Sequence, residues 1–183
     1  MQDTPIKIAV LAGTARPLRR SIHAARYVAY VGEQFPGVEI RFADPREFQF
    51  PGDGEDPDGK DPRYSELTAW ADAFFIVTPE YNHGYPGSLK RMLDSEFAAY
   101  HRKAVALAGV SDGNWGGVRA IEALLPVLRT LRLVVSPFDV QFPRVQELFD
   151  EQGQIKDTSV EERIKKAYEE LLWVAKALRD ARA

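Results

Sequence analysis

Short runs of almost purely apolar residues recur along this chain, and they constrain its fold more than any other feature. Residues 73–77 (AFFIV) form the most apolar run, and residues 6–12 and 104–110 are of the same kind. An apolar run that is too short for a helix and does not alternate with polar residues is typical of a strand buried on both faces, as in a parallel sheet. These runs therefore predict an α/β fold with helices on both sides of the sheet.

Helical patterns separate these runs, and two weaker strands complete the series. Residues 38–42 alternate apolar with charged side chains, which indicates a strand nearer the sheet edge, and residues 133–142 read as a strand interrupted by Pro137. We expect helices at residues 21–34, 66–72, 86–100, 117–132 and 160–178. Five strands alternating with five helices predict a three-layer, doubly wound parallel sheet. The order 2-1-3-4-5 is expected, because it gathers the carboxyl ends of strands one, three and four around one crevice.

Length and composition narrow the class of protein. We expect residues 1–183 to form a single domain, in which the Pro-, Gly- and Asp-rich residues 44–63 are a surface loop. The net charge of −3 offers no basic field for a nucleic acid, and we find no signal peptide or membrane span. The absence of cysteine excludes disulfides and thiolate chemistry and fits a cytoplasmic protein.

No metal site is expected either. His23 and His101 have no partner at the spacing of metal ligands. The acidic residues 53–61 contain prolines and lack the terminal glutamate of a calcium loop. We interpret them as a solvated surface segment.

The loop after the first strand, residues 13–21, has the composition of a phosphate site. It combines the hydroxyls of Thr14 and Ser21 with three arginines and the start of a helix, whose free amides favour an anion. Three arginines at a helix N-terminus repel one another unless an anion joins them. In the alternative interpretation, Ser21 only caps the helix and the arginines are solvated. The loop spells neither GxxxxGK(S/T) nor GxGxxG, which disfavours a P-loop and a standard dinucleotide site.

The loop after the third strand, residues 78–90, is suited to a flat ring. Prolines and glycines stiffen it, and Tyr81 offers an aromatic face. Proline and glycine alone would also suit a plain connecting turn. The spelling is more specific, because the pattern PEYN-x3-PG-x-LK followed by MLD closely resembles the signature of the NADPH-dependent FMN reductase family. Together with the GTxR start of the first loop, the resemblance covers most of the domain.

This family includes quinone, azo and chromate reductases of flavodoxin-like fold. The resemblance implies a bound FMN, with NADPH or NADH as hydride donor. The acceptor would be a free flavin, a quinone, an azo compound or chromate, reduced by alternating hydride transfer through the FMN. A homodimer or homotetramer is also implied. The alternative is a flavodoxin-type FMN electron carrier that does not oxidise NAD(P)H itself, although flavodoxins usually have hydroxyl and amide donors where this chain has arginines.

The residues that the resemblance assigns to FMN come from three loops. The first loop would hold the phosphate, and PEYN would border the isoalloxazine, with main-chain groups near Asn82 at its N5 and O4 edge. The glycine-rich residues 109–117 would lie at the pyrimidine edge. No catalytic side chain is expected, because the flavin carries the hydride chemistry. The expected cofactor-binding residues are Thr14, Arg16, Arg20, Ser21, Ile22, Pro79, Glu80, Tyr81, Asn82, Ser111 and Gly113.

Other residues near these loops keep more than one interpretation. Trp115 is expected beside the substrate opening, and His83 is either a proton donor or a solvated residue. Trp70 and Trp173 are expected to pack in the core or in an interface. A last group belongs either to the core or to a contact between subunits: Leu89, Met92, Leu93 and Phe97.

Overall fold

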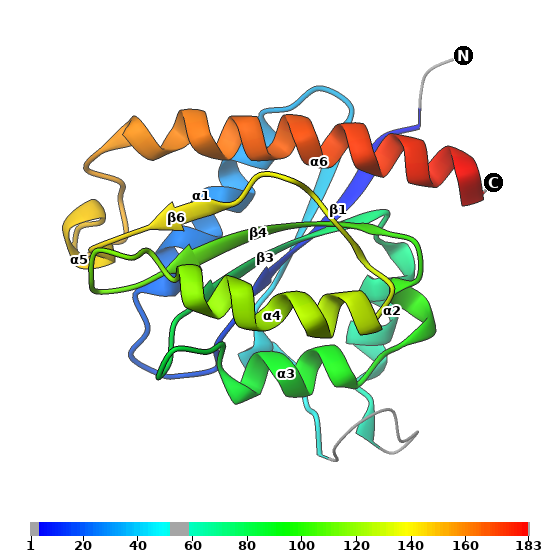
Figure 1. Cartoon of the computed structure of the whole chain (residues 1–183), viewed down its shortest axis with the longest axis horizontal. Coiled ribbons are helices and arrows are strands. Elements are labelled where there is room, and N and C mark those ends of the chain that lie inside the picture. The colour runs from blue at the N-terminus through cyan, green and yellow to red at the C-terminus, as the bar shows by residue number, and fades with distance from the viewer. Residues whose placement is uncertain (1–3, 52–58, 183) are drawn as a thin grey trace.

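A parallel sheet forms the centre of the computed structural model, which describes residues 4–51 and 59–182. The strands lie in the order β2-β1-β3-β4-β5, and β6 also pairs with β4 (Figure 1). The predicted fold class and strand order are therefore confirmed. The strands are β1 (Ile6–Ala12), β2 (Val38–Ala43), β3 (Ala73–Pro79), β4 (Ala104–Val110), β5 (Val134–Val135) and β6 (Val140–Phe142).

The predicted fifth strand, residues 133–142, is divided into β5 and β6. Val134 of β5 lies opposite Ala104 at the start of β4, and Val140 of β6 lies opposite Ala108 near its end. Pro137 lies between the two short strands and has no amide hydrogen to donate to a neighbour. The outer edge of the sheet is therefore interrupted, and β6 carries the chain back to the carboxyl end of β4.

Helices cover both faces of the sheet; α6 extends to Arg182, beyond the predicted end at residue 178, the short α5 was not predicted, and the bounds of α2 and α3 also differ from the prediction. α2 begins earlier than predicted because the Asp61 carboxylate caps it, accepting from the Arg63 amide at 2.9 Å. α3 ends at Asp94 instead of continuing to residue 100: the Ser95 hydroxyl donates to the Met92 carbonyl at 2.8 Å, and Glu96 turns inward to a buried position. The helices are α1 (Ser21–Glu33), α2 (Pro62–Trp70), α3 (Gly87–Asp94), α4 (Val118–Thr130), α5 (Val145–Leu148) and α6 (Glu161–Arg182).

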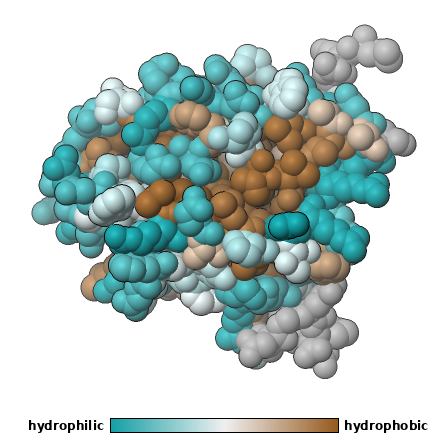
Figure 2. Space-filling model, viewed as in Figure 1, coloured by the Kyte–Doolittle hydropathy of each residue, from teal (hydrophilic) through white to brown (hydrophobic). Residues whose placement is uncertain are grey.

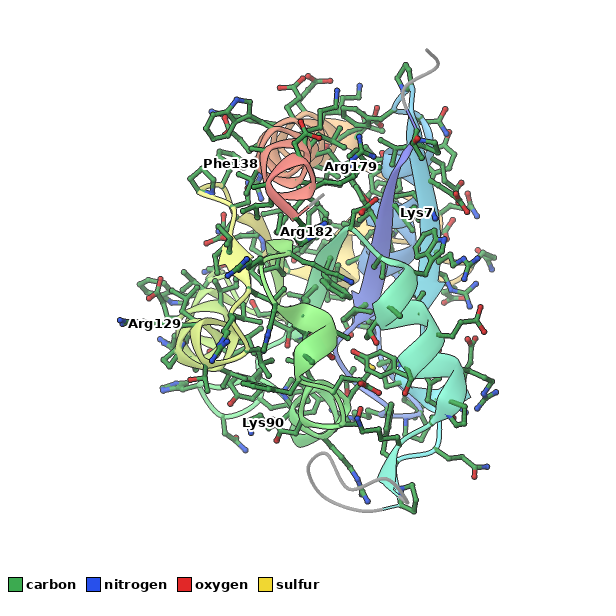
Figure 3. The ribbon with its side chains drawn as sticks, turned by 90° about the vertical axis from the view of Figure 1, so that its right-hand side faces the viewer. Lys7, Lys90, Arg129, Phe138, Arg179 and Arg182 are labelled. Carbon is green, nitrogen blue, oxygen red and sulfur yellow. The ribbon has the colours of Figure 1, made fainter. Side chains whose placement is uncertain are left out.

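Two apolar cores flank the sheet, because successive strand residues point to opposite faces. Phe75 and Val77 of β3 belong to the core that includes α1 and α6, whereas Phe74 and Ile76 belong to the core that includes α2, α3 and α4. Figure 3 shows α6 on one side of the sheet and α3 and α4 on the other. All residues of β3 and β4 are buried, as their unbroken apolar runs predict.

The last turns of α6 are attached to the end of the sheet where β1 begins. Arg179 donates to the Thr4 carbonyl at 2.9 Å, and Arg182 pairs with Asp72 at 3.5 Å. Figure 3 shows both arginines at this end of α6. These contacts lie far from the carboxyl ends of the strands, where a ligand of a doubly wound sheet binds.

An apolar band lies exposed on the surface, and two of the three tryptophans, Trp115 and Trp173, are exposed as well. Figure 2 shows hydrophobic residues gathered on the face between α4 and α6, where the sheet ends. Trp173 is 72% exposed, which contradicts a place in the core: it lies on the face of α6 opposite to the buried Leu171 and Ala175. Trp70 packs against the second core, with the Arg41 guanidinium 4.3 Å from its ring centre.

Within the described part of the chain, none of the helices has the length and hydropathy that a membrane crossing requires. Most of the acidic residues 53–61, interpreted above as a solvated segment, lie outside the described residues. In the rest of the predicted surface loop, residues 45–47 form a short 3-10 helix (Pro45–Glu47) capped by Asp44.

Candidate functional site

The loops after β1, β3 and β4 meet at the carboxyl ends of these strands and line a cavity of about 750 Å³, which we call the site cavity. Eight predicted cofactor-binding residues line it: Arg16, Arg20, Ser21, Ile22, Pro79, Glu80, Tyr81 and Ser111. Thr14, Asn82 and Gly113 belong to the same loops but are not part of the lining. The lining also includes Val110 and Asp112 of the glycine-rich segment 109–117, and His23 and Val145, which sequence reasoning did not assign to the site. No sequence signal marks Val145, because α5 brings it to the site from beyond β6.

Loop one (residues 13–20) is attached closely to β3 and to loop two (residues 80–86). A Cβ atom at Gly13 would lie 2.7 Å from the Thr78 Cα, so only glycine allows β1 to leave the sheet this close to β3. The Thr14 hydroxyl lies 3.0 Å from the Tyr81 hydroxyl and accepts from the Arg16 amide at 3.2 Å. Thr14 therefore joins the two loops and fixes the start of loop one.

The start of α1 is open to an anion, but not in the way that the sequence predicts. Ser21 does not cap the helix: Arg20 is the N-cap residue, and no side chain of the described residues bonds the helix amides there. Because Arg20 already has a helical conformation, the chain enters the helix directly and Ser21 becomes its first, buried residue. The first amides of a helix have no intrahelical acceptor, and the first turn of α1 contains no acidic residue. The amides of Ser21 and Ile22 are therefore placed to bind an anion.

The three arginines of loop one have different environments. Arg19 forms a buried ion pair with Asp44, the residue after β2, and donates to the Thr14 carbonyl at 2.9 Å. Its charge is therefore already neutralised, which corrects the argument that all three arginines need an external anion. Arg16 and Arg20 are exposed and line the site cavity. Two cations, and not three, are available to a phosphate.

Loop two folds back on itself in a tight turn. The Tyr81 amide donates to the Gly84 carbonyl at 2.8 Å, and the Gly84 amide donates to the Tyr81 carbonyl at 3.0 Å. Asn82 and His83 occupy the turn with φ angles of 50° and 66°, the left-handed region that a type I′ turn requires at both central residues. Asn and His tolerate this region better than most residues. Both side chains are exposed at the tip, whereas Tyr81 is half-buried against loop one.

Glu80 has the most constrained carboxylate of the site. Its Oε1 accepts from Arg119 at 3.1 Å, and the side chain is only 11% exposed. Arg119 in turn lies 5.3 Å from the ring centre of the exposed Trp115. The Oε2 of Glu80 is buried and has no hydrogen-bond partner among the described residues. An unpaired buried oxygen is costly, so a ligand with an N–H group would stabilise this position.

Loop three (residues 111–117) is packed tightly onto β4. A Cβ atom at Gly109 would lie 2.5 Å from the Gly116 carbonyl oxygen, and one at Gly117 would lie 2.4 Å from the Val110 nitrogen. The Ser111 hydroxyl donates to the Gly113 carbonyl at 2.9 Å, and the Ser111 amide donates to Phe142 of β6 at 3.1 Å. Glycines are therefore required for close approach of the backbone, and β6 holds the near end of the loop.

The residues present fit an FMN. The amides of α1 with Arg16 and Arg20 form a cationic end that lacks an anion, and a phosphate supplies one. Tyr81 and Pro79 form a flat, apolar wall at the other end. The pyrimidine part of an isoalloxazine carries an N–H group. This group can donate the hydrogen bond that Glu80 Oε2 does not receive from the described residues. Among the described residues, no group of three or more His, Asp or Glu side chains is placed to hold a metal ion.

Comparisons with known proteins agree with this assignment. A family model described as NADPH-dependent FMN reductase matches residues 6–147. A curated relative, the NAD(P)H-dependent FMN reductase LOT6 of Saccharomyces cerevisiae, is 33% identical over 47% of this chain and 44% of its own length. A second NAD(P)H-dependent FMN reductase, from Schizosaccharomyces pombe, is 30% identical over 75% of this chain and 72% of its own.

A solved structure shares the fold at low sequence identity. The flavoenzyme NAD(P)H:acceptor oxidoreductase FerB from Paracoccus denitrificans superimposes with a TM-score of 0.70 at 20% identity, over 93% of this chain and 98% of the other. The match to the family model, over residues 6–147, extends from β1 into α5 and so includes all three loops of the site cavity.

Proposed function

Since the chain belongs to the NADPH-dependent FMN reductase family, we infer that it is an FMN-dependent NAD(P)H oxidoreductase that reduces a small acceptor. Bound FMN supplies hydride chemistry, taking hydride from NADPH or NADH and passing it to a free flavin, a quinone, an azo compound or chromate. The donor and the acceptor use the same opening in turn. We propose that residues 1–183 form one FMN-binding domain.

One observation carries this proposal: the site cavity joins a cationic end to an aromatic end. Arg16, Arg20 and the first amides of α1 form the cationic end, and Tyr81 forms the aromatic one. FMN has the matching polarity, a phosphate at one end and a flat ring system at the other. A free phosphate would use only the first half of this cavity, and a simple aromatic compound only the second.

The proposal gives each loop a separate task. Loop one and the start of α1 bind the phosphate: Arg16, Arg20 and the Ser21 and Ile22 amides donate charge-assisted hydrogen bonds to it. Thr14 contributes indirectly, because its hydroxyl positions Tyr81.

Loops two and three enclose the ring system. Pro79 and Tyr81 form its wall, Glu80 accepts a hydrogen bond from it, and the main chain near Asn82 borders it. Ser111 and Gly113 lie at the pyrimidine edge. None of these side chains has to donate or remove a proton for hydride transfer, and His83, exposed at the tip of loop two, has no proton-transfer role in the proposal.

Absorption spectra test the proposed function directly. The purified protein, supplied with FMN and freed of excess, should show a flavin spectrum that bleaches when NADPH or NADH is added without oxygen. After the dinucleotide is removed by gel filtration, a quinone should restore the oxidised spectrum. Recovery in this separate second step is the mark of alternating transfer.

The same experiment separates the alternative function. A flavodoxin-type carrier would bind FMN and accept electrons from dithionite, but neither dinucleotide would bleach it. The exposed Arg16 and Arg20 favour the reductase, because a carrier of that type usually has hydroxyl and amide donors in this place. A colourless protein that does not bind FMN would contradict both functions.

We also propose that the protein forms a homodimer or homotetramer and that it is located in the cytoplasm. Leu89, Met92 and Leu93 are fully buried in the core of this chain, so they are not available to a subunit contact. The exposed Trp173 and Val134 are available to one. Sedimentation velocity should give a species of two or four chains, and a monomer at all concentrations would contradict this part. The lack of cysteine supports the cytoplasmic location.

A further inference from the structure

The ion pair between Arg119 and Glu80 connects α4 to the site cavity. Arg119 is the second residue of α4, and Glu80 is the residue after β3 that lines the cavity. The Glu80 amide donates to the Val110 carbonyl at 3.0 Å, which fixes the main chain of Glu80 against the end of β4. The side chain of Glu80 therefore starts from a fixed position, and its carboxylate is oriented by what it contacts.

Helix stability alone does not explain an arginine at the start of α4. The N-terminal end of a helix carries a partial positive charge, so a cation in the first turn is unfavourable there and an anion is favourable. The first turn of α4 contains no acidic residue. The missing negative charge comes from another loop, because Glu80 Oε1 accepts from Arg119 at 3.1 Å. The position of Arg119 is therefore explained by the carboxylate that it binds.

The pair is asymmetric in its exposure. The Glu80 side chain is 11% exposed and the Arg119 side chain 41%, and the guanidinium also lies 5.3 Å from the ring centre of the exposed Trp115. Arg119 binds only Oε1 of Glu80, and Oε2 is buried without a hydrogen-bond partner among the described residues. Arg119 thus occupies one oxygen of the carboxylate and leaves the other to a ligand. Arg119 itself does not line the site cavity.

This arrangement controls the charge beside a bound ring. Reduction of a flavin adds negative charge to its pyrimidine part, and charges near this part tune its electronics. A lone carboxylate there would repel the reduced form more than the oxidised form. A guanidinium at hydrogen-bond distance offsets the field of the carboxylate, because the two opposite charges lie almost at the same place.

We propose that Arg119 is a positioning residue that holds Glu80 with Oε2 free for the ring, offsets the charge of the carboxylate, and so sets the reduction potential of the bound FMN. The inference rests on the proposed function, and it adds to it a residue that acts through Glu80. Arg119 is not among the cofactor-binding residues predicted from the sequence, because its role depends on a contact between α4 and loop two.

Midpoint potentials of the FMN-loaded protein, measured with dithionite and a reference dye, test this role without any dinucleotide. Arg119→Ala leaves the carboxylate unbalanced and should lower the potential by about 30 mV, which corresponds to a tenfold greater loss of affinity for reduced than for oxidised FMN. Arg119→Lys keeps the charge and should recover most of this shift. Glu80→Gln leaves the guanidinium unbalanced and should raise the potential, whereas the double variant R119A/E80Q should return it towards the original value.

The control variant removes the same charge elsewhere on the same helix. Arg129 is exposed on the outer side of α4, about 15 Å along the helix from Arg119 (Figure 3), and Arg129→Ala should leave the potential unchanged. If Arg119→Ala is too unstable to study, E80Q and R119A/E80Q provide the same comparison without a buried carboxylate, and the loss of Arg119 should again lower the potential.

A structural role would give a different result. Equal potentials with and without Arg119, together with the same loss of affinity for oxidised and reduced FMN, would overturn the proposal. If neither dinucleotide reduces the flavin, the proposed function fails, while the potentials measured with dithionite still decide on Arg119.

Discussion

Gly109→Ala is expected to lower the free energy of unfolding by about 3 kcal/mol, the upper range for a side chain forced into a packed site. The added Cβ would lie 2.5 Å from the Gly116 carbonyl oxygen and 2.8 Å from the Gly117 carbonyl carbon. Both are backbone atoms, so no rotamer change relieves the clash. Loop three must move away from β4, and its part of the site cavity moves with it.

Urea unfolding followed by circular dichroism measures this change. Gly113→Ala, in loop three next to β4, is the control, because a Cβ there meets no atom of the described residues within 4 Å and the position is exposed. It should change the free energy of unfolding by no more than about 0.5 kcal/mol. Similar losses in the two variants would show that an added methyl group destabilises the protein at both positions. The close approach of the backbone at Gly109 would then not be the cause of the loss.

Arg19→Ala should have a comparable or larger effect, a loss of about 3–5 kcal/mol of unfolding free energy, because it leaves a buried carboxylate without its partner. The Arg19 and Asp44 side chains are 5% and 9% exposed. The Thr14 carbonyl also loses a donor. Thermal or urea unfolding gives the magnitude. The double variant R19A/D44A should recover part of the loss, because no unpaired charge then remains buried.

Arg16→Ala provides the contrast within the same loop. Arg16 is exposed and has no carboxylate partner within the described residues, so the variant should unfold like the original protein. Its FMN affinity should fall by about 1.5–3 kcal/mol, the range of a hydrogen bond to a charged group. Fluorescence titration with FMN measures this loss. A stable Arg19→Ala variant together with an unstable Arg16→Ala variant would reverse the two assignments.

These arginines show where sequence reasoning ends. Arg16, Arg19 and Arg20 are equivalent in the sequence, since each is a cation in a loop that precedes a helix. The difference between them depends on Asp44, which lies at the end of another strand and approaches Arg19 only when β1 and β2 pair. A contact between elements distant in the sequence leaves no local pattern.

Other elements follow from local physics and are predicted well. The strands β1, β3 and β4 come from runs that are apolar throughout or, in β1, apart from Lys7, and their pairing places three loops at one end of the sheet, as the strand order predicts. Cap positions and helix ends are less predictable. Serine is a common N-cap residue, but Ser21 does not cap α1, because the helical conformation of Arg20 makes Arg20 the N-cap residue. α3 ends because Glu96 is buried in a tertiary contact with Ser65, which periodicity does not show.

The turn at Asn82 and His83 has a consequence for how a ring is received. Tyr81 and Gly84 close the turn with two backbone hydrogen bonds, and both central residues already have the strained left-handed conformation. Loop two is thus preorganised by folding alone, and little conformational entropy is left to lose when a partner arrives. The rate at which FMN dissociates should then depend mainly on its phosphate, because loop two keeps the same conformation in the FMN-free and the FMN-bound protein.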